Sequence, residues 1–121
     1  MANEILSVVE KVNAAFAAGD VEAFLTQCAD DVVFTMVGHQ RVEGKAAIRK
    51  WMANSPSEPP KFSVQSVIAT QDRVVCYGDM TMTEADGTGS YEYCDVYRIE
   101  NGKVKELRAY VIKIGSVGDV W

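Results

Sequence analysis

Apolar residues recur with helical spacing over the N-terminal part of the chain. From Ile5 to Phe16 they occupy every third or fourth position, which predicts an amphipathic helix that ends at Gly19. Asp20 follows directly and has the side chain of a helix N-cap, so a second, shorter helix is expected over residues 21–28. The two helices should therefore meet at a tight corner.

Beyond these helices the pattern changes to the two-residue alternation of strands. Apolar and β-branched residues alternate over 32–37, 62–70 and 73–83, and each segment is expected to form a strand. Residues 38–44 begin and end with glycine and are expected to form a loop, whereas residues 45–53 have one apolar and one basic side and predict a third helix.

Residues 91–110 predict a β-hairpin. The Asn-Gly pair at 101–102 is flanked by aromatic and β-branched residues, and it is typical of a two-residue turn because both positions tolerate positive φ. On the first strand Asp95 alternates with Tyr93 and Tyr97, so the three side chains should share one face. A carboxyl group would then point toward whatever the aromatic rings enclose.

The order of these elements predicts the fold class. Helices come first, a short helix follows the first strand, and short turns join the remaining strands. This order is typical of an α+β domain in which helices cover one face of a curved, mostly antiparallel sheet. With 121 residues, 48% of them hydrophobic, the chain can form one core, and we expect a single domain over 1–121.

Composition excludes several classes of function. The net charge is −5 and basic residues do not cluster, so the chain lacks the positive surface on which nucleic-acid binding depends. We expect no signal peptide and no membrane association, because the N-terminus lacks a basic start and no stretch approaches the roughly 20 apolar residues that span a bilayer. A cytoplasmic protein is therefore expected.

The metal-ligating residue types are few and scattered. Cys28, Cys76 and Cys94 lie among apolar residues without CxxC spacing, which favours buried free thiols over a disulfide framework or a zinc site. His39 is the single histidine, whereas a catalytic zinc draws several ligands from His, Cys and carboxylates. We expect no metal and no cofactor.

Four short segments, spread over nearly the whole chain, are informative together. They are A-A-G-D at 17–20, A-D-D-V-V-F at 29–34, G-K-A-A-I-R-K-W at 44–51 and D-V-Y-R-I-E-N-G-K-V at 95–104. In this order the chain resembles the nuclear transport factor 2-like superfamily, in particular its polyketide-cyclase-like (SnoaL-like) and ketosteroid-isomerase-like branches. The resemblance implies a cone-shaped roll, in which three helices lean on a curved sheet and enclose an apolar pocket. It also implies a homodimer formed through the outer face of the sheet.

The resemblance allows the functional positions of the family to be compared with this chain. The carboxylate base of the isomerase branch lies late in the first strand, where this chain has Met36. In the cyclase and epoxide-hydrolase branches an acid stands two residues after a last-strand tyrosine, whereas here Ile112 follows Tyr110 at that distance. Only Asp95 matches an isomerase site residue.

Asp95 is accordingly the first candidate for catalysis. Burial among tyrosines would disfavour its anion and raise its pKa, so that a neutral acid could donate a hydrogen bond. The alternative is a structural role, with a partner such as a tyrosine, a backbone amide or Arg108. His39 is the second catalytic candidate if its loop folds over the pocket, although a loop histidine is more often solvated. For Asp79, a charged residue within a strand, an exposed position is favoured.

Large side chains are expected either to line the pocket or to fill the core, two roles that periodicity does not distinguish. The ligand-binding candidates are Phe16, Phe34, Met36, Trp51, Tyr97 and Tyr110.

The leading hypothesis is a cofactor-independent isomerase, cyclase or dehydratase that acts on a small, largely apolar molecule, since such reactions need proton transfer in a dry pocket. Two alternatives stay open. One is a non-catalytic module that binds a metabolite, and the other is a dimeric protein-interaction domain whose pocket is filled by its own side chains. The tail over 115–121 suggests an arm that packs elsewhere.

Overall fold

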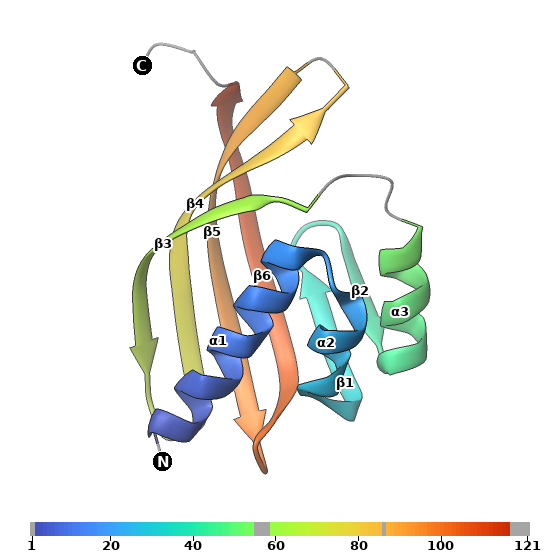
Figure 1. The fold of residues 1–121 in the computed structure, drawn as a ribbon, viewed down its shortest axis with the longest axis vertical. Coiled ribbons are helices and arrows are strands. Elements are labelled where there is room, and N and C mark those ends of the chain that lie inside the picture. Colours follow the sequence, from blue (N-terminus) through green and yellow to red (C-terminus); the bar gives the residue numbers. More distant parts are fainter. Residues whose placement is uncertain (1, 55–58, 86, 117–121) are drawn as a thin grey trace.

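Three helices lie on one face of a six-stranded, curved and unclosed sheet (Figure 1). The computed structural model describes residues 2–54, 59–85 and 87–116, so most of the expected C-terminal arm lies outside the described residues. The helices are α1 (Ala2–Ala18), α2 (Val21–Thr26) and α3 (Lys45–Ala53). The strands are β1 (Cys28–Met36), β2 (Gln40–Glu43), β3 (Lys61–Ala69), β4 (Arg73–Glu84), β5 (Gly87–Glu100) and β6 (Lys103–Ser116).

The sheet is mostly antiparallel and has the strand order β2-β1-β6-β5-β4-β3. Only β1 and β6 pair in parallel, because the chain crosses from one side of the sheet to the other before it returns through the β3–β6 meander. The α+β class and the helix-covered curved sheet are confirmed. None of the described helices has the length and apolar character needed to cross a bilayer.

The corner between α1 and α2 forms as the sequence predicts. Gly19 has a φ of +68°, which lets the chain turn, and the Asp20 backbone N–H donates to the Ala15 carbonyl at 2.9 Å. The Asp20 carboxylate then accepts a hydrogen bond from the Ala23 N–H at 3.0 Å and caps α2. The second helix is shorter than expected, because residue 28 already belongs to β1 and pairs with Val104.

The expectation of a loop over residues 38–44 was wrong in part. Val37, Gly38 and His39 form a tight turn, and residues 40–43 then return as β2, with Val42 opposite Phe34 of β1. Val42 is the one apolar residue of Q-R-V-E, so the segment carries almost no hydrophobic signal of its own. Its strand conformation comes from hydrogen bonding to the edge of β1.

The hairpin predicted around 101–102 is confirmed. Glu100 pairs with Lys103, and Asn101 and Gly102 both have positive φ, at +54° and +74°. Along β5 the inward side chains are buried, and they are those of Tyr93, Asp95, Tyr97 and Ile99.

A bulge near this turn decides which way β6 faces. Ile99 pairs with Val104, but the next pair is Arg98 with Glu106, so Lys105 is an extra residue in β6. Without the bulge, regular pairing of the same residues would place Tyr110 opposite Tyr93 on the inner face of the sheet. With it, Tyr110 pairs with Cys94 and faces outward, while its neighbours Ala109 and Val111 face the helices.

The core lies between the helices and the half of the sheet that is nearer the β5–β6 turn (Figure 1). Side chains from all three helices and from the sheet are almost fully buried, among them Val9, Val12, Phe24, Leu25, Val32, Ile48, Val74, Tyr97, Val104 and Leu107. Each fully buried apolar side chain contributes about 1.5–3 kcal/mol. This packing closes one end of the cone, and the opposite end contains the cavities described below.

Gly78 permits β3 to approach β4 at a second bulge, between Val64 and Ser66. A Cβ atom on Gly78 would lie 2.0 Å from the Ser63 carbonyl oxygen.

Because the backbone would have to move, we expect Gly78→Ala to lower the free energy of unfolding by about 3 kcal/mol, measured by urea denaturation. The control Gly38→Ala meets open space and adds only the strain of a positive φ, about 1–2 kcal/mol. Equal losses in the two variants would contradict this account of Gly78.

Candidate ligand-binding site

A deep cavity of about 200 Å³ lies between α1 and the inner face of the sheet. Strands β1, β3, β4, β5 and β6 contribute to its wall, as do α1 and α3, so it is enclosed by elements from the whole chain. Its lining residues are Phe16, Phe34, Met36, Met52, Pro60, Phe62, Met80, Met82, Tyr93, Asp95, Leu107, Ala109 and Val111.

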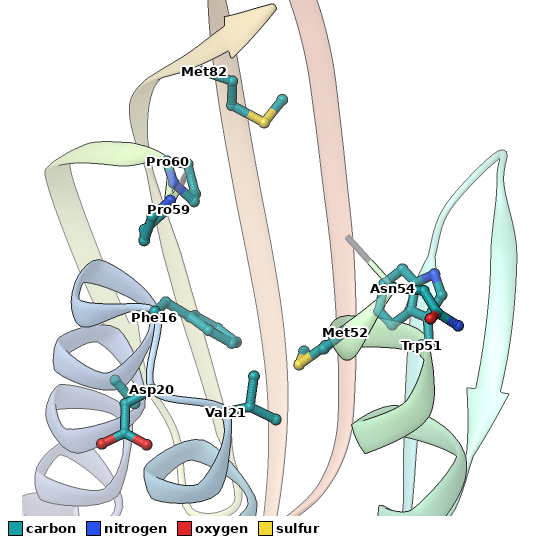
Figure 2. Close-up of a pocket in the computed structure, with 11 residues that line it drawn as sticks. Phe16, Asp20, Val21, Trp51, Met52, Asn54, Pro59, Pro60 and Met82 are labelled. Carbon is teal, nitrogen blue, oxygen red and sulfur yellow. The ribbon is translucent and has the colours of Figure 1, made fainter. Parts of the chain in front are cut away.

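A second, wider cavity of about 600 Å³ adjoins the deep cavity, and we call it the rim cavity. The two share Phe16, Met52, Pro60 and Met82 in their linings. Figure 2 shows the rim cavity, with Phe16 from α1 and Met52 from α3 pointing toward each other across it. Together the two spaces fall within the size range of small-molecule pockets.

Aromatic rings surround the deep cavity. A continuous series of contacts runs from α1 to α3, with ring centroids 4.7 Å apart for Phe16 and Phe24, 6.2 Å for Phe24 and Phe34, and 5.2 Å for Phe34 and Trp51. Phe62 and Tyr93 form a further edge-to-face pair, at 5.3 Å. Such pairs stabilise one another beyond simple burial, so the wall has a defined shape.

Among the described residues, Asp95 is the one carboxyl group in the lining of the deep cavity, and this residue is only 7% exposed. In the part of the chain that the structure describes, no group donates a hydrogen bond to this carboxyl and no cation pairs with it. Among the same residues, no fully enclosed polar atom lacks a partner, so the carboxyl oxygens of Asp95 are not fully enclosed, and the residue lines the deep cavity. Burial raises the pKa of Asp95 to about 7.

The groups beside Asp95 remain protonated at neutral pH. Burial, and then the Asp95 charge, raises the pKa of Tyr93 to about 12, and burial raises the pKa of Tyr97 well above its ordinary value. The Tyr97 hydroxyl donates to the Asn13 side-chain carbonyl at 3.5 Å, and the Asn13 amide lies 3.9 Å from the Cys76 sulfur. Cys76 lies opposite Asp95 on β4, and burial raises the pKa of its thiol. Tyr97, Asn13 and Cys76 therefore form a short series of polar side chains next to Asp95.

The structure places five of the predicted site residues in the linings of the two cavities. Phe16, Phe34, Met36 and Asp95 line the deep cavity, and Trp51 lines the rim cavity. The partner suggested for Asp95 in a structural role, Arg108, is instead on the opposite face of the sheet, where its guanidinium donates to the Tyr110 hydroxyl.

The remaining predicted residues lie away from both cavities. Tyr97 is fully buried beneath α1, and Tyr110 is 38% exposed on the outer face of the sheet. His39 is exposed in the turn between β1 and β2. Asp79 is exposed as favoured from the sequence, and its carboxylate accepts a hydrogen bond from the Gln65 side chain at 3.2 Å.

Methionines form a part of the site that sequence reasoning missed. Met52, Met80 and Met82 line the deep cavity beside Met36, so four of the five methionines of the chain contribute to one wall. The alternation of residues 80 and 82 with the inward-facing Cys76 would have indicated two of them. Thioether side chains are flexible and polarizable, and they adapt to ligands of different shape.

Metal ligands do not gather in this site. Over residues 2–54, 59–85 and 87–116 there is no cluster of three or more His, Cys, Asp or Glu residues able to hold a metal ion. The chemistry available from the described lining is therefore that of one buried carboxyl, the Tyr93 hydroxyl and an apolar wall.

The structure thus combines helices on one face of a curved sheet with an apolar cavity whose lining contains an acid. Residues 9–107 match the model of the SnoaL-like domain family. The chain belongs to this family, and the resemblance inferred from its four segments is confirmed. No curated protein sequence matches the chain significantly.

Solved structures show the same fold at low sequence identity. An NTF2-like protein of unknown function from Burkholderia pseudomallei has a TM-score of 0.83 at 19% identity, over 88% of this chain and 89% of the other. A candidate polyketide cyclase from Xanthomonas campestris has a TM-score of 0.82 at 20% identity, over 90% of each chain. A candidate ketosteroid isomerase from Kribbella flavida has a TM-score of 0.78 at 13% identity, over 98% and 85%. At these identities the likeness establishes the fold alone.

The raised pKa of Asp95 predicts a specific dependence of stability on pH. Since the pKa is about 7 in the folded chain and 3.8 for an ordinary aspartate, the folded state holds a proton that the unfolded state has released between these values. The free energy of unfolding of the wild type therefore falls as the pH rises toward 7. The Asp95→Asn variant carries no such proton, so its stability does not fall for this reason. We expect the variant to gain on the order of 4 kcal/mol relative to wild type between pH 4 and pH 8, measured by urea unfolding.

The matched control for this measurement is Asp79→Asn, which removes an exposed carboxyl from the opposite face of β4. Its stability should follow that of the wild type at both pH values. Parallel curves for wild type and Asp95→Asn would show that Asp95 is not held in a dehydrating environment.

Proposed function

We propose that the protein binds a small, largely apolar carbonyl compound in the deep cavity and catalyses a cofactor-independent proton transfer on it. The observation that carries the proposal is Asp95, a buried carboxyl without a partner among the described residues, in contact with an apolar cavity. Its pKa of about 7 makes both its acid and its base form available near neutral pH, which general acid–base catalysis requires.

The described lining offers one carboxyl, which restricts the reaction to those that a single group can perform. The Asp95 carboxylate would remove a proton from the carbon next to the carbonyl and leave an enolate. The resulting acid would return that proton to the enolate oxygen or to another carbon, giving an enol or an isomer. Tyr93 lines the same cavity, and its hydroxyl would donate to the carbonyl oxygen, where negative charge develops.

A non-catalytic binding module is the second candidate. It is favoured by Met36, which lines the cavity at the position where the isomerase branch has its carboxylate base. A chain that has kept the pocket but not the base is suited to binding a metabolite without converting it.

Exchange of carbon-bound protons distinguishes the two functions. With 2-tetralone in D2O, we expect wild-type protein to accelerate deuterium incorporation next to the carbonyl, and Asp95→Asn to reduce this rate by about 10²-fold or more. Proton NMR follows the loss of signal, and Asp79→Asn serves as the control that retains the wild-type rate. Saturable binding of the ketone without Asp95-dependent exchange would replace the catalytic proposal by the binding module.

We further propose a homodimer formed through the outer face of the sheet, as the family resemblance implies. Exposed apolar side chains gather there, with Ile68 55% exposed, Tyr77 41%, Tyr110 38% and Ile112 65%. Register places Tyr77 and Tyr110 in one row across the strands, with Ile112 in the next row. A two-fold axis would bring this apolar patch of one copy onto the same patch of a second copy, as an isologous interface requires.

A charge on this face tests the dimer. Ile112→Glu should shift the protein to monomer in size-exclusion chromatography with light scattering, because a carboxylate would be buried in the interface. Val64→Glu is the matched control, since Val64 is 45% exposed but lies beside α1 rather than on the outer face. A wild-type monomer, or equal effects of both substitutions, would contradict the proposed interface.

A further inference from the structure

The polar groups of the deep cavity are unequally distributed between donors and acceptors. Asp95 supplies two carboxyl oxygens, whereas the described lining contains no Lys, Arg, His or side-chain amide. The Tyr93 hydroxyl is the other polar side-chain group, and the remaining residues contribute rings, thioethers and aliphatic carbons. An ionised Asp95 therefore has no cation to replace the water that burial removes.

We propose that the deep cavity binds the ammonium group of a lipophilic tertiary amine, with Asp95 as its counter-ion. This inference concerns the same cavity and carboxyl as the proposed function and rests on it to that extent. It adds a second chemical class of ligand, one whose charge stabilises the ionised form of Asp95, whereas a neutral carbonyl ligand carries no charge to compensate that form.

Three features of the molecule favour a cation. A ligand ammonium would pair with the buried carboxylate and compensate its lost hydration, while an anionic ligand would meet the same carboxylate with repulsion. The rings of Phe16, Phe34, Phe62 and Tyr93 line the cavity, and aromatic faces attract cations. The net charge of −5 attracts cations to the protein from solution.

The number of acceptors favours a tertiary amine over other amines. A tertiary ammonium has one N–H donor, which the Asp95 carboxylate satisfies. A primary ammonium would bring further N–H donors into a wall of Phe and Met side chains, and unsatisfied buried donors are costly. A quaternary ammonium has no N–H to donate and loses the charge-assisted hydrogen bond.

The cavity also restricts the size of the amine. Its volume of about 200 Å³ is roughly seven times the share of one liquid water molecule, enough for one ring with a methylated nitrogen. A longer substituent would extend past Phe16 and Met52 into the rim cavity, which shares both residues.

The two ligand classes differ in their dependence on pH. The titratable groups that face Asp95 are Tyr93 and Tyr97 on β5 and Cys76 on β4, with Cys94 adjacent in sequence. All four have a raised pKa, and α1 and β6 present Asn13, Leu107 and Ala109, which do not titrate. Asp95 is therefore the group that titrates near neutrality, so amine affinity should rise with pH and ketone affinity should fall.

Calorimetric titration with isosteric probes tests the inference. The probes are N,N-dimethylbenzylamine, its hydrocarbon isostere isobutylbenzene, benzylamine, phenylacetate and 2-tetralone. At pH 8 we expect wild-type protein to bind the tertiary amine roughly ten- to a hundredfold more tightly than the isostere, and more tightly than benzylamine, with no binding of phenylacetate. The amine affinity should increase about tenfold from pH 6 to pH 8.

Two variants separate electrostatic from structural effects. Asp95→Asn should lose the preference for the amine while binding isobutylbenzene as the wild type does, and Asp79→Asn should behave as the wild type with both probes. Equal affinity of wild type for amine and isostere, or an amine affinity independent of Asp95, overturns the inference. If the inference fails in this way but ketone affinity still falls as the pH rises, the proposed function stands. If the protein selects the amine but does not bind the ketone, the inference stands and the proposed function is removed.

Discussion

The pairing of β5 with β4 on one side and β6 on the other is the constraint on which the site depends. A strand held along both edges cannot rotate, so its alternation fixes Tyr93, Asp95 and Tyr97 on the inner face. The carboxyl is thereby buried in an apolar environment, where its ionised form is disfavoured and its pKa rises to about 7. The hairpin that organises the sheet is thus also the element that activates the candidate acid.

Much of this arrangement could be predicted from the sequence, because it depends on short-range signals. The 101–102 turn, the Asp20 cap and the alternation around Asp95 are local, and the structure agrees with each. What could not be predicted depends on pairing between distant segments. Strand β2 exists only beside β1, and Tyr110 faces outward because of an extra residue that no propensity indicates. The cavity itself is a matter of packing, which periodicity does not describe.

The candidate site combines an apolar wall with a buried carboxyl group. Its wall is apolar and rich in thioethers, which suits ligands held by shape, while its one carboxyl makes the cavity sensitive to the protonation state of protein and ligand. Family membership is established by residues 9–107, but family members are not bound to one reaction. The fold therefore does not determine the chemistry of this member, and the chemistry proposed for it depends on Asp95 and its immediate surroundings.

The bulge at Lys105 determines which residues of β6 face the helices and which face outward. If the same residues continued regular pairing with β5 past Ile99 and Val104, without the bulge, the two faces of the strand beyond this point would exchange. Arg108, Tyr110 and Ile112 would then enter the cavity, and the apolar residues of its wall would become the outer surface. A substitution changes one contact at a time, whereas the presence or absence of this bulge changes the pocket and the opposite face together. In chains that share this topology at 13–20% identity, the gain or loss of such a bulge would change the residues that line the pocket without changing the fold.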